Sequence, residues 1–498
     1  MQDTVKPLRI ALDPALRETR GPELAWTWRL LLTTLGHPWL EVSPGAECDI
    51  AHVASGVSPG PARIVILAQP DRWEAQGRLH LDDIDERDGW SFLRFRGEAP
   101  PRRAPELGNG SVILDHDTVF DAFWLASGRP EAEWAHNRHG HPEPDQLFKE
   151  REIFTRALAS GLASRLERAL RTAGVPPGLP RWPHGKRAAA CLTHDVDYPE
   201  VVRWLEPLRV LRRRGCAGAR AALDVALGRR STWHFDSWLR LEDRYEARSA
   251  FYFVARKGSL LEYATKTPDS FYDITSPRFR ALFRRLDGEG AEIALHASYR
   301  AFEDSSRFAA EKAALEDAAG VSVTGNRHHY LHLDPHRPEE TLLLHESLGF
   351  EYDSTLGHDR FLGWRNGMAL PFFPYQTRAR REIDTIQLPF AWMDQHLFQF
   401  GSDNPGDPAE LLDGLSSRVA EQGGCLVVNI HDYTYDDELF PGWRKAYAGL
   451  LQHLRESGDF WIETPRAIAR HWRTRADSIA AASDGLSDGA RPTVTVQR

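Results

Sequence analysis

The sequence has few cysteines, no long apolar run and no excess of positive charge. Scattered free cysteines are typical of a reducing compartment and exclude a disulfide-stabilised scaffold. A net charge of −9 excludes a general nucleic-acid binder, because neutralising phosphates requires a basic surface. The four cysteines lie too far apart in the chain to form a CxxC pair: Cys48, Cys191, Cys216 and Cys425.

Membrane and export signals are lacking as well. No stretch approaches about 18 consecutive apolar residues, so we expect no integral membrane contact. The first residues, MQDTVKPLRIALDP, lack the apolar run that follows the basic residues of a signal peptide. We therefore expect a cytoplasmic protein, whose oligomeric state the sequence leaves open.

Length and composition are those of a globular protein with two or three domains. The chain has 498 residues, of which 42% are hydrophobic and 27% charged. The proline-rich segment VPPGLPRWPHGK, at 175–186, predicts a domain boundary, because proline at that density ends a helix and does not sit inside a sheet. We predict an α/β domain of unknown role at 1–180, a second domain at 181–474, and a disordered tail, rich in Ala, Ser, Gly and Asp, at 475–498.

Short apolar strands alternate with amphipathic helices after the boundary, which favours a parallel sheet or barrel. Strands are expected at 188–192, 250–254, 291–295, 321–324, 385–388, 425–430 and 459–463. Before the boundary, strands are expected at 8–12, 49–53 and 64–67, and helices at 24–35 and 149–172.

Conspicuous polar residues follow three of the expected strands. Asp195 and Asp197 end the first strand of the second domain, and in an extended chain they project to the same side. His296 and His431 follow two later strands. Because active sites of parallel α/β folds lie at the carboxyl ends of strands, these side chains are expected to converge. Two close carboxylates need a cation or a shared proton, so one is expected to bind a divalent metal and the other to act as a base.

The segment from about Arg187 to Trp472 resembles the polysaccharide deacetylases of the NodB-homology family, the family-four carbohydrate esterases. The motifs CLTHDVDYP, FYFVARKG, GAEIALHAS, GNRHHYL and LVVNIHD carry this resemblance, in the family's order. It implies a deformed (β/α) barrel and a divalent metal, usually zinc. It also implies hydrolysis of N-acetyl or O-acetyl groups on a carbohydrate substrate.

The resemblance also implies a role for individual residues. Asp195 matches the catalytic base, Arg327 the arginine that orients it, and His431 the general acid. Asp197 and His296 match metal ligands, and the backbone N–H of Tyr330 matches part of the oxyanion hole.

One position departs from the family pattern. The second histidine of the family's H-S/T-x-x-H motif is replaced by Arg300, which cannot ligate a metal. A catalytic zinc usually has three protein ligands and a water. His329 occupies the place of the family's proline in RHHY, and we predict that it supplies the third ligand. Its neighbour His328 and, more weakly, Tyr299 are the alternatives.

A narrower resemblance concerns a bacterial subfamily with an N-terminal α/β domain, often associated with cell-surface polysaccharide synthesis. The segments EYDSTLG and GWRNGMALPFFPY carry it. Within and near them, Asp353, Trp364, Arg365 and Asp394 are further candidates for contact with substrate.

Three functions remain open at this point. The first is a metal-dependent hydrolase that deacetylates N-acetylated sugars or a cell-surface polysaccharide precursor. The second is a hydrolase of another non-peptide C–N bond on the same fold, such as a cyclic amide. The third is a catalytically inactive carbohydrate-binding homologue, which the retention of Asp195, Asp197, Arg327 and His431 opposes.

Overall fold

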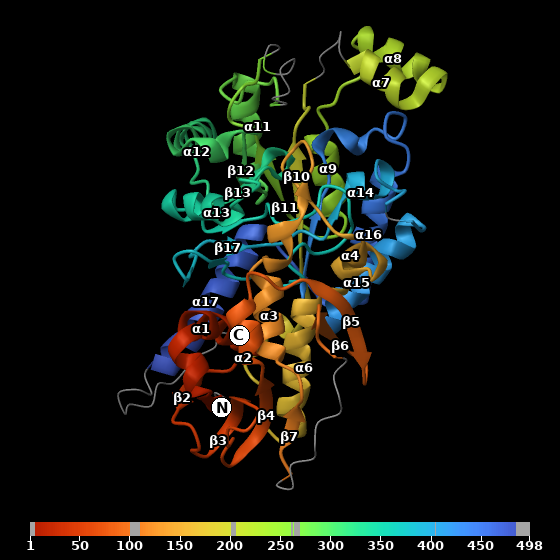
Figure 1. The fold of residues 1–498 in the computed structure, drawn as a ribbon. Coiled ribbons are helices and arrows are strands. Elements are labelled where there is room, and N and C mark those ends of the chain that lie inside the picture. Colours follow the sequence, from red (N-terminus) through yellow and green to blue (C-terminus); the bar gives the residue numbers. More distant parts are fainter. Residues whose placement is uncertain are drawn as a thin grey trace.

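The computed structural model describes residues 5–99, 110–200, 206–259, 262, 269–403 and 405–484. The red and orange N-terminal unit, residues 5–172, lies at one end of the molecule and the barrel, residues 188–463, at the other (Figure 1). The N-terminal unit contains β1 (Leu8–Leu12), α1 (Pro14–Leu35), β2 (Trp39–Val42), β3 (Cys48–Ala54), β4 (Ala62–Ala68), α2 (Pro70–Ala75), β5 (Leu81–Arg87), β6 (Trp90–Phe95), β7 (Val112–Leu114), α3 (Thr118–Ala126), η1 (Arg129–Glu133), β8 (Ala135–His136), β9 (Pro142–Glu143), α4 (Gln146–Glu150), α5 (Ile153–Arg156) and α6 (Leu158–Thr172).

The N-terminal unit is built on a five-stranded parallel sheet in the order β2-β1-β3-β4-β7. Asp13 begins α1 by accepting hydrogen bonds from the N–H groups of Ala15 and Leu16, which satisfies donors that have no partner within the helix. Gly36 ends the helix in the left-handed conformation that glycine adopts without strain. The three strands predicted here are confirmed as β1, β3 and β4.

The single helix predicted over 149–172 is wrong, because the chain forms α4, α5 and α6 instead. Glu152 and Ala157 adopt positive φ angles of 49° and 46°, which interrupt a helix. The carbonyl of Phe154 accepts a hydrogen bond from the N–H of Trp364, 2.9 Å away. A hydrogen bond to the barrel thus replaces a hydrogen bond within the helix, and the local spacing of apolar residues does not reveal this.

The barrel and its flanking helices follow in chain order. They are η2 (Pro183–Gly185), β10 (Ala188–Val196), α7 (Glu206–Arg214), η3 (Gly215–Gly218), α8 (Ala219–Ala226), α9 (Phe235–Asp243), β11 (Ser249–Phe253), α11 (Pro277–Gly288), β12 (Glu292–Ala297), η4 (Ala301–Glu303), α12 (Ser305–Ala319), β13 (Gly325–His328), η5 (His329–Leu331), α13 (Pro338–Ser347), β14 (Tyr352–Asp353), β15 (Tyr375–Gln376), β16 (Arg381–Glu382), β17 (Ile386–Gln387), β18 (Trp392–Met393), α14 (Asp394–Phe398), α15 (Pro408–Gln422), β19 (Cys425–Asn429), η6 (Asp432–Tyr435), α16 (Trp443–Ser457), β20 (Phe460–Ile462) and α17 (Pro465–Asp484).

The large sheet is parallel throughout and runs β17-β14-β13-β12-β11-β10-β19-β18, with β20 also paired to β10. The edge strands β17 and β18 are separated in sequence by residues 388–391 only. In this connection, the N–H of Leu388 bonds to Asp353 on one side and that of Ala391 to Val427 on the other. The chain therefore crosses from one edge of the sheet to the other, which confirms the predicted deformed (β/α) barrel preceded by a smaller α/β unit.

The strand predicted at 321–324 lies four residues later, as β13. The N–H of Val323 donates to the Glu316 side chain, and the carbonyl of Thr324 accepts from the N–H of Glu351. These two residues therefore belong to the loop that precedes the strand. The shift matters because it places Arg327 inside β13 and His329 immediately after it.

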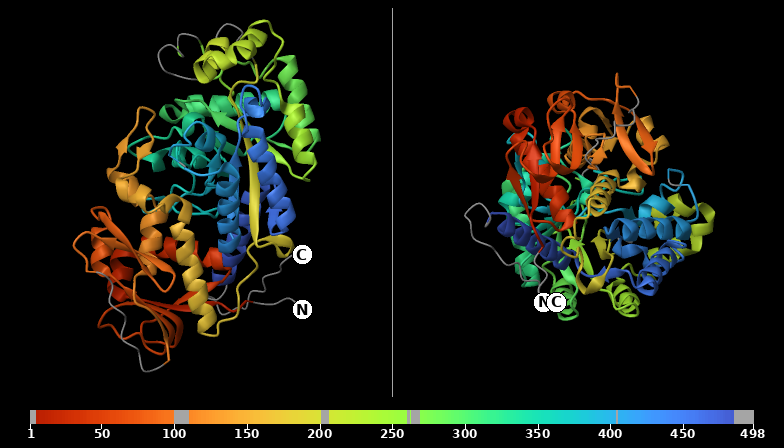
Figure 2. Two further views of the ribbon diagram at one scale, coloured as in Figure 1. Left: turned by 90° about the vertical axis from the view of Figure 1, so that its right-hand side faces the viewer. Right: turned by 90° about the horizontal axis from the view of Figure 1, so that it is seen from below.

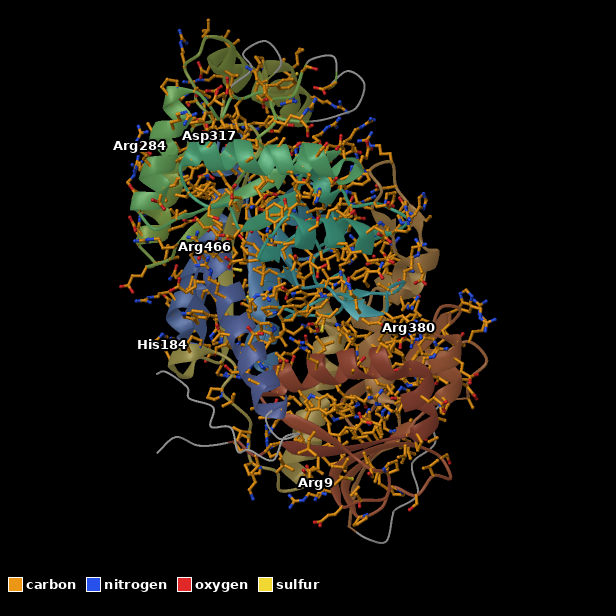
Figure 3. The ribbon with its side chains drawn as sticks, turned by 90° about the vertical axis from the view of Figure 1, so that its left-hand side faces the viewer. Arg9, His184, Arg284, Asp317, Arg380 and Arg466 are labelled. Carbon is orange, nitrogen blue, oxygen red and sulfur yellow. The ribbon has the colours of Figure 1, made fainter. Side chains whose placement is uncertain are left out.

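The C-terminal helix α17 packs against the N-terminal unit. Residues 475–484, predicted to be disordered, are its last turns, and the rest of the predicted tail lies outside the described residues. Arg475 is buried and its Nε donates to the carbonyl of Thr33 in α1, 2.8 Å away. Arg380 of the barrel likewise donates to Glu23 of α1, at 2.7 Å (Figure 3). The contact of Arg475 orders the end of the chain, which its composition alone does not predict.

One hydrophobic cluster includes side chains of both units, among them Trp28, Phe123 and Phe372. The division predicted at residue 180 is therefore bridged by a shared core. Among the described helices, none combines the length and the apolar character needed to span a membrane.

Candidate active site

The polar residues that follow the predicted strands converge at one end of the barrel. Asp195 lies in β10 and Asp197 directly follows that strand, while His296 lies in β12 opposite Arg327 of neighbouring β13. His431 comes two residues after β19, which pairs with β10. All five side chains are buried.

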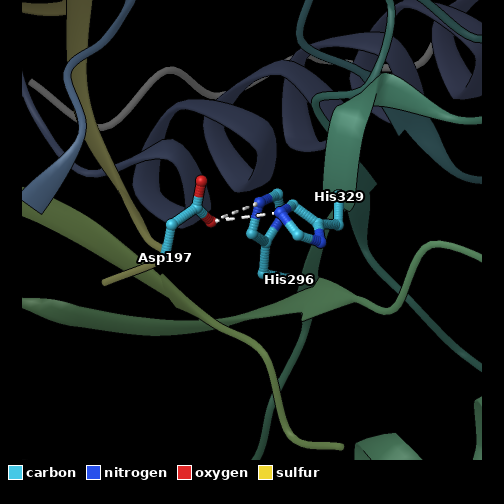
Figure 4. Close-up of side chains that lie close together, drawn as sticks. All are labelled: Asp197, His296 and His329. Carbon is cyan, nitrogen blue, oxygen red and sulfur yellow. Dashed lines mark ion pairs between the residues drawn. The ribbon is translucent and has the colours of Figure 1, made fainter. Parts of the chain in front are cut away.

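Asp197, His296 and His329 form a cluster with the chemistry of a metal site (Figure 4). The Nε2 atoms of both histidines lie 3.5 Å from Oδ1 of Asp197, and the three potential ligand atoms lie within 4.8 Å of one another. Oδ1 of Asp197 and Nε2 of His329 are buried and have no hydrogen-bond partner among the described residues. Buried polar atoms normally have a partner, so this pair fits a missing ligand such as a cation.

Each histidine of the cluster is oriented by a hydrogen bond on its far nitrogen. Nδ1 of His296 lies 2.9 Å from the carbonyl oxygen of Arg327. Because a carbonyl only accepts, Nδ1 carries the hydrogen and the lone pair of Nε2 is directed to the cluster when the ring is neutral. Nδ1 of His329 lies 3.3 Å from Oδ1 of Asp269. Such partners orient histidine ligands and raise their basicity. Sequence reasoning missed Asp269.

The charges of the cluster are mutually dependent. Burial lowers the pKa of His329, but the carboxylates of Asp197 and Asp269 outweigh it and raise that pKa to about 10. Burial opposes ionisation of Asp197, yet His329, His296 and His431 hold its pKa well below the usual range. Two nitrogens and one carboxylate are a donor set that suits zinc. The residues present therefore fit a divalent cation, which would replace the protons that now balance Asp197.

Of the residues considered for the third ligand position, His329 alone joins Asp197 and His296. His328 faces the other way, where its Nε2 lies 2.9 Å from Nε2 of His345. The Tyr299 hydroxyl is bonded to His139, and Arg300 is an exposed residue next to it.

Asp195 is held as a carboxylate by two side chains. Its Oδ1 accepts from Nη1 of Arg327 and its Oδ2 from the side-chain amide of Asn429, both at 2.8 Å. Burial raises the pKa of Asp195, but Arg327, His296 and His431 bring it below its usual value. Arg327 is fixed in turn by Ser354, whose carbonyl and hydroxyl both accept from it at 3.0 Å. Asn429 is the polar residue that interrupts the apolar strand β19, and this interruption was the signal in the sequence that could have identified it.

His431 is paired with Asp394, which was predicted to contact substrate. Oδ1 of Asp394 lies 2.8 Å from Nδ1 of His431 and Oδ2 accepts from the His431 N–H at 2.8 Å. Burial lowers the pKa of His431, but Asp394, Asp197 and Asp195 outweigh it and raise the value to about 10. Asp394 thus positions the imidazole and keeps it protonated, while Nε2 of His431 faces Asp197 at 3.6 Å.

A further buried carboxyl, that of Asp432, supports the site from behind. Its Oδ1 accepts from the N–H of Asp197 at 3.0 Å. Burial and the nearby carboxylate of Asp197 raise the pKa of Asp432 well above its usual value. A neutral Asp432 adds no negative charge beside Asp197 and fixes the backbone that carries it.

Tyr330 has a strained backbone and a ring at the surface. Its φ of 57° and that of Leu331, 51°, are unusual for residues with a Cβ. Such strain is concentrated at functional sites. The residue is 39% exposed, and the centroid of its ring lies 4.9 Å from that of the His329 ring.

The remaining predicted substrate residues are placed elsewhere. Asp353 is buried and accepts from the side chains of Asn326 and Thr355, at 2.8 and 2.7 Å, and Trp364 is completely buried. Arg365 forms a two-pronged bond with Glu131 of the N-terminal unit, at 2.8 and 2.7 Å. Asp353 and Arg365 are therefore buried and already hydrogen-bonded to other residues of the protein, so a substrate would have to displace these partners.

The sequence matches no protein-family model and no curated protein sequence. Among solved structures, the chain is similar to a proposed polysaccharide deacetylase from Mycobacterium smegmatis, with 20% identity, 64% of this chain and 96% of that chain covered, and a TM-score of 0.39. It is also similar to Puue allantoinase, with 15% identity, 60% of this chain and 95% of that chain covered, and a TM-score of 0.40. A third similar structure is a proposed polysaccharide deacetylase from Pseudomonas aeruginosa PAO1, with 16% identity, 61% of this chain and 97% of that chain covered, and a TM-score of 0.40. Polysaccharide deacetylases are thus among the solved structures to which this chain is similar.

Proposed function

We propose that this protein is a metal-dependent hydrolase that removes acetyl groups from N-acetylated sugars or from a cell-surface polysaccharide precursor. The observation that carries the proposal is the arrangement around Asp197. A cluster suited to a cation, Asp197 with His296 and His329, lies beside an oriented carboxylate, Asp195, and an oriented imidazolium, His431. Metal-assisted hydrolysis of an amide uses these three elements together: a cation for the carbonyl, a general base and a general acid.

A divalent cation held by the cluster would polarise the acetyl carbonyl and lower the pKa of a water molecule. The three side chains that would hold it are Asp197, His296 and His329. Zinc is the first candidate because two imidazoles and a carboxylate match its usual ligands.

Asp195 acts as the general base. Its two oxygens are fixed by Arg327 and Asn429, but each keeps a lone pair that accepts the proton of the attacking water. Arg327 holds the carboxylate in its charged form and in one orientation, at some cost in basicity. Water oxygen then bonds to the acetyl carbon.

His431 acts as the general acid. Asp394 holds its Nδ1, so the Nε2 hydrogen is left to pass to the sugar nitrogen as the C–N bond breaks. The products are acetate and an amino sugar. The backbone N–H of Tyr330 is proposed to bind the carbonyl oxygen as its charge develops, a contribution worth about 3 kcal/mol in enzymes where it has been removed.

The test is acetate release by the purified full chain from N,N′-diacetylchitobiose and from UDP-N-acetylglucosamine, with zinc added. Asp195→Asn is expected to reduce the turnover by a factor of about 100 or more, because general base catalysis contributes 10² to 10⁴. Asp317→Asn, a change on the exposed face of α12, is the matched control and should retain activity (Figure 3). Release of acetate at the same rate by Asp195→Asn would refute the role of the base.

Two further measurements, hydrolysis of a cyclic amide and binding of the sugars, separate the alternatives. Hydrolysis of a cyclic amide such as dihydrouracil, without acetate release from either sugar, would favour the second C–N hydrolase function. Sugar binding without any hydrolysis would favour the inactive homologue.

A further inference from the structure

The β8–β9 hairpin of the N-terminal unit lies against the barrel at the candidate active site. Nδ1 of His139, in the hairpin turn, lies 3.0 Å from the Tyr299 hydroxyl. The His139 ring lies 5.0 Å from that of Tyr330, which itself lies 4.9 Å from that of His329. In Figure 2 the orange segment with β8 and β9 stands beside the teal part of the barrel. A continuous path of rings thus joins the proposed metal cluster to the N-terminal unit.

The hairpin turn is fixed in place and is not a loose loop. The side-chain oxygen of Asn137 accepts from the N–H groups of His139 and His141, at 2.9 and 3.2 Å. Its amide nitrogen donates to Asp359 of the barrel at 3.0 Å. Gly140 has a φ of 73°, and a Cβ there would press on the barrel at 3.2 Å. The turn therefore holds its side chains against the site before any substrate binds.

The hydrogen bonds of His139 determine what Tyr299 offers to a ligand. Nε of Arg138, which only donates, lies 2.9 Å from Nε2 of His139. Nε2 is therefore the acceptor and Nδ1 carries the hydrogen, which it donates to the Tyr299 oxygen. Burial, together with Arg138 and His332, lowers the pKa of His139 and keeps the ring neutral. The hydroxyl hydrogen of Tyr299 is left to donate to another molecule.

Two exposed arginines stand near the same hydroxyl. Arg138 reaches this hydroxyl through His139, to whose Nε2 it donates, and Arg300 is the residue that follows Tyr299 in the chain. Burial raises the pKa of Tyr299, whereas Arg300 and Arg138 act in the opposite direction. Among the described residues Arg138 has no carboxylate partner, and the Nε of Arg300 lies 4.0 Å from its one carboxylate, Glu303. One arginine comes from the hairpin and the other from the barrel, so only the folded chain brings both of them near Tyr299.

We propose that the β8–β9 hairpin is a second wall of the substrate site, where Arg138 and Arg300 bind an anionic group of the substrate. That group, a phosphate or a carboxylate, would lie next to the acetylated sugar, to which Tyr299 donates a hydrogen bond. The inference rests on the proposed function and specifies its substrate class. It also gives Arg300 a role at a position where it cannot ligate a metal.

The test measures binding, so that it does not depend on turnover. The full chain carrying Asp195→Asn, with zinc present, is titrated calorimetrically with three probes. They are UDP-N-acetylglucosamine, which carries a diphosphate, N-acetylmuramic acid, which carries a carboxylate, and neutral N,N′-diacetylchitobiose. One anionic probe is expected to bind about tenfold more tightly than chitobiose, a difference of about 1.4 kcal/mol. If the tighter probe is UDP-N-acetylglucosamine, the bound anion is a phosphate, and if it is N-acetylmuramic acid, the bound anion is a carboxylate.

Variants in the same background assign the effect to residues. Arg138→Gln and Arg300→Gln are each expected to reduce the preference for the anionic probe about tenfold and to leave chitobiose binding unchanged. Arg284→Gln, on the exposed face of α11, is the matched control and should change neither (Figure 3). Tyr299→Phe should weaken all three probes alike, because the sugar hydrogen bond is common to them.

Equal affinity for charged and neutral probes, an unchanged preference in both arginine variants, or no binding of any probe would overturn the inference. The proposed function fails separately. If the wild-type chain releases no acetate while the arginine-dependent preference persists, the binding site stands and the deacetylase proposal falls.

Discussion

Nε2 of His329 lies 3.5 Å from Oδ1 of Asp197, and neither atom has a hydrogen-bond partner among the described residues. The two residues are 132 positions apart and come from different strand ends. His329 thus stands beside Asp197 and His296 where a third ligand is needed, while the arginine that replaces the usual histidine faces outward.

The first prediction concerns the third ligand. His329→Ala should reduce the affinity for zinc by a factor of about 100 or more, because one of three proposed protein ligands is removed. Zinc content after dialysis and a competitive chelator titration measure it. His336→Ala, an exposed histidine of the same segment, should leave zinc binding unchanged. Equal zinc affinity in His329→Ala and wild type would exclude His329 as a ligand.

The second prediction concerns the pH dependence of metal binding. Since the pKa of His329 is about 10 in the metal-free protein, a cation has to displace a proton, and zinc affinity should increase as the pH rises from 6.5 toward 10. The raised pKa also stabilises the metal-free fold below pH 6.5, a contribution that is lost as the pH rises through about 10. Titrations at several pH values, with proton release measured in two buffers, test this. Affinity that is flat over this range contradicts the protonated state of the cluster.

The third prediction concerns Asp394. Its carboxylate holds the pKa of His431 high, so Asp394→Asn should lower that pKa. Because the general acid must be protonated, the alkaline limb of the pH profile of kcat should move to lower pH, while the acidic limb, which reports Asp195, should stay in place. If both limbs move together, or neither does, Asp394 does not act through His431.

The fourth prediction concerns Arg365 and Glu131, which join the barrel to the N-terminal unit. Their side chains are only 6% and 11% exposed, so Glu131→Gln leaves a buried guanidinium without its counter-ion. The free energy of unfolding should fall by about 3 kcal/mol in urea denaturation. The KM for the sugar substrate should stay constant if Arg365 is an anchor. A raised KM with an unchanged free energy of unfolding would support the contact between Arg365 and substrate that the sequence predicted.

The sequence predicted more of the site's members than of their partners. The structure brings together five residues that the sequence singled out, each in a short motif at the end of a strand: Asp195, Asp197, His296, Arg327 and His431. Motifs are local, and parallel strands bring their carboxyl ends to one edge. The partners were missed or given other roles because hydrogen bonds span long stretches of chain. These partners are Asp269, Asn429, Asp432 and Asp394, which hold His329, Asp195, Asp197 and His431 respectively.

Element boundaries show the same division. The strand β19 lies at 425–429, close to the predicted 425–430, whereas β10 begins at the predicted residue 188 but extends to 196, four residues beyond its apolar run. The helix predicted at 149–172 is broken by bonds to the barrel, and the end of α17 is ordered by α1. The cytoplasmic location stays a prediction, since it depends on no contact within the fold.

By itself, the sequence determined the alternation of strands and helices, the order of the motifs and the chemistry available at the strand ends, because all of these depend on residues close together in the chain. The tertiary structure alone decided that His329 faces Asp197 while His328 faces His345, and that His139 reaches Tyr299. The direction of a side chain at the end of a strand, and the docking of one unit on another, depend on packing between distant segments, which no local pattern records.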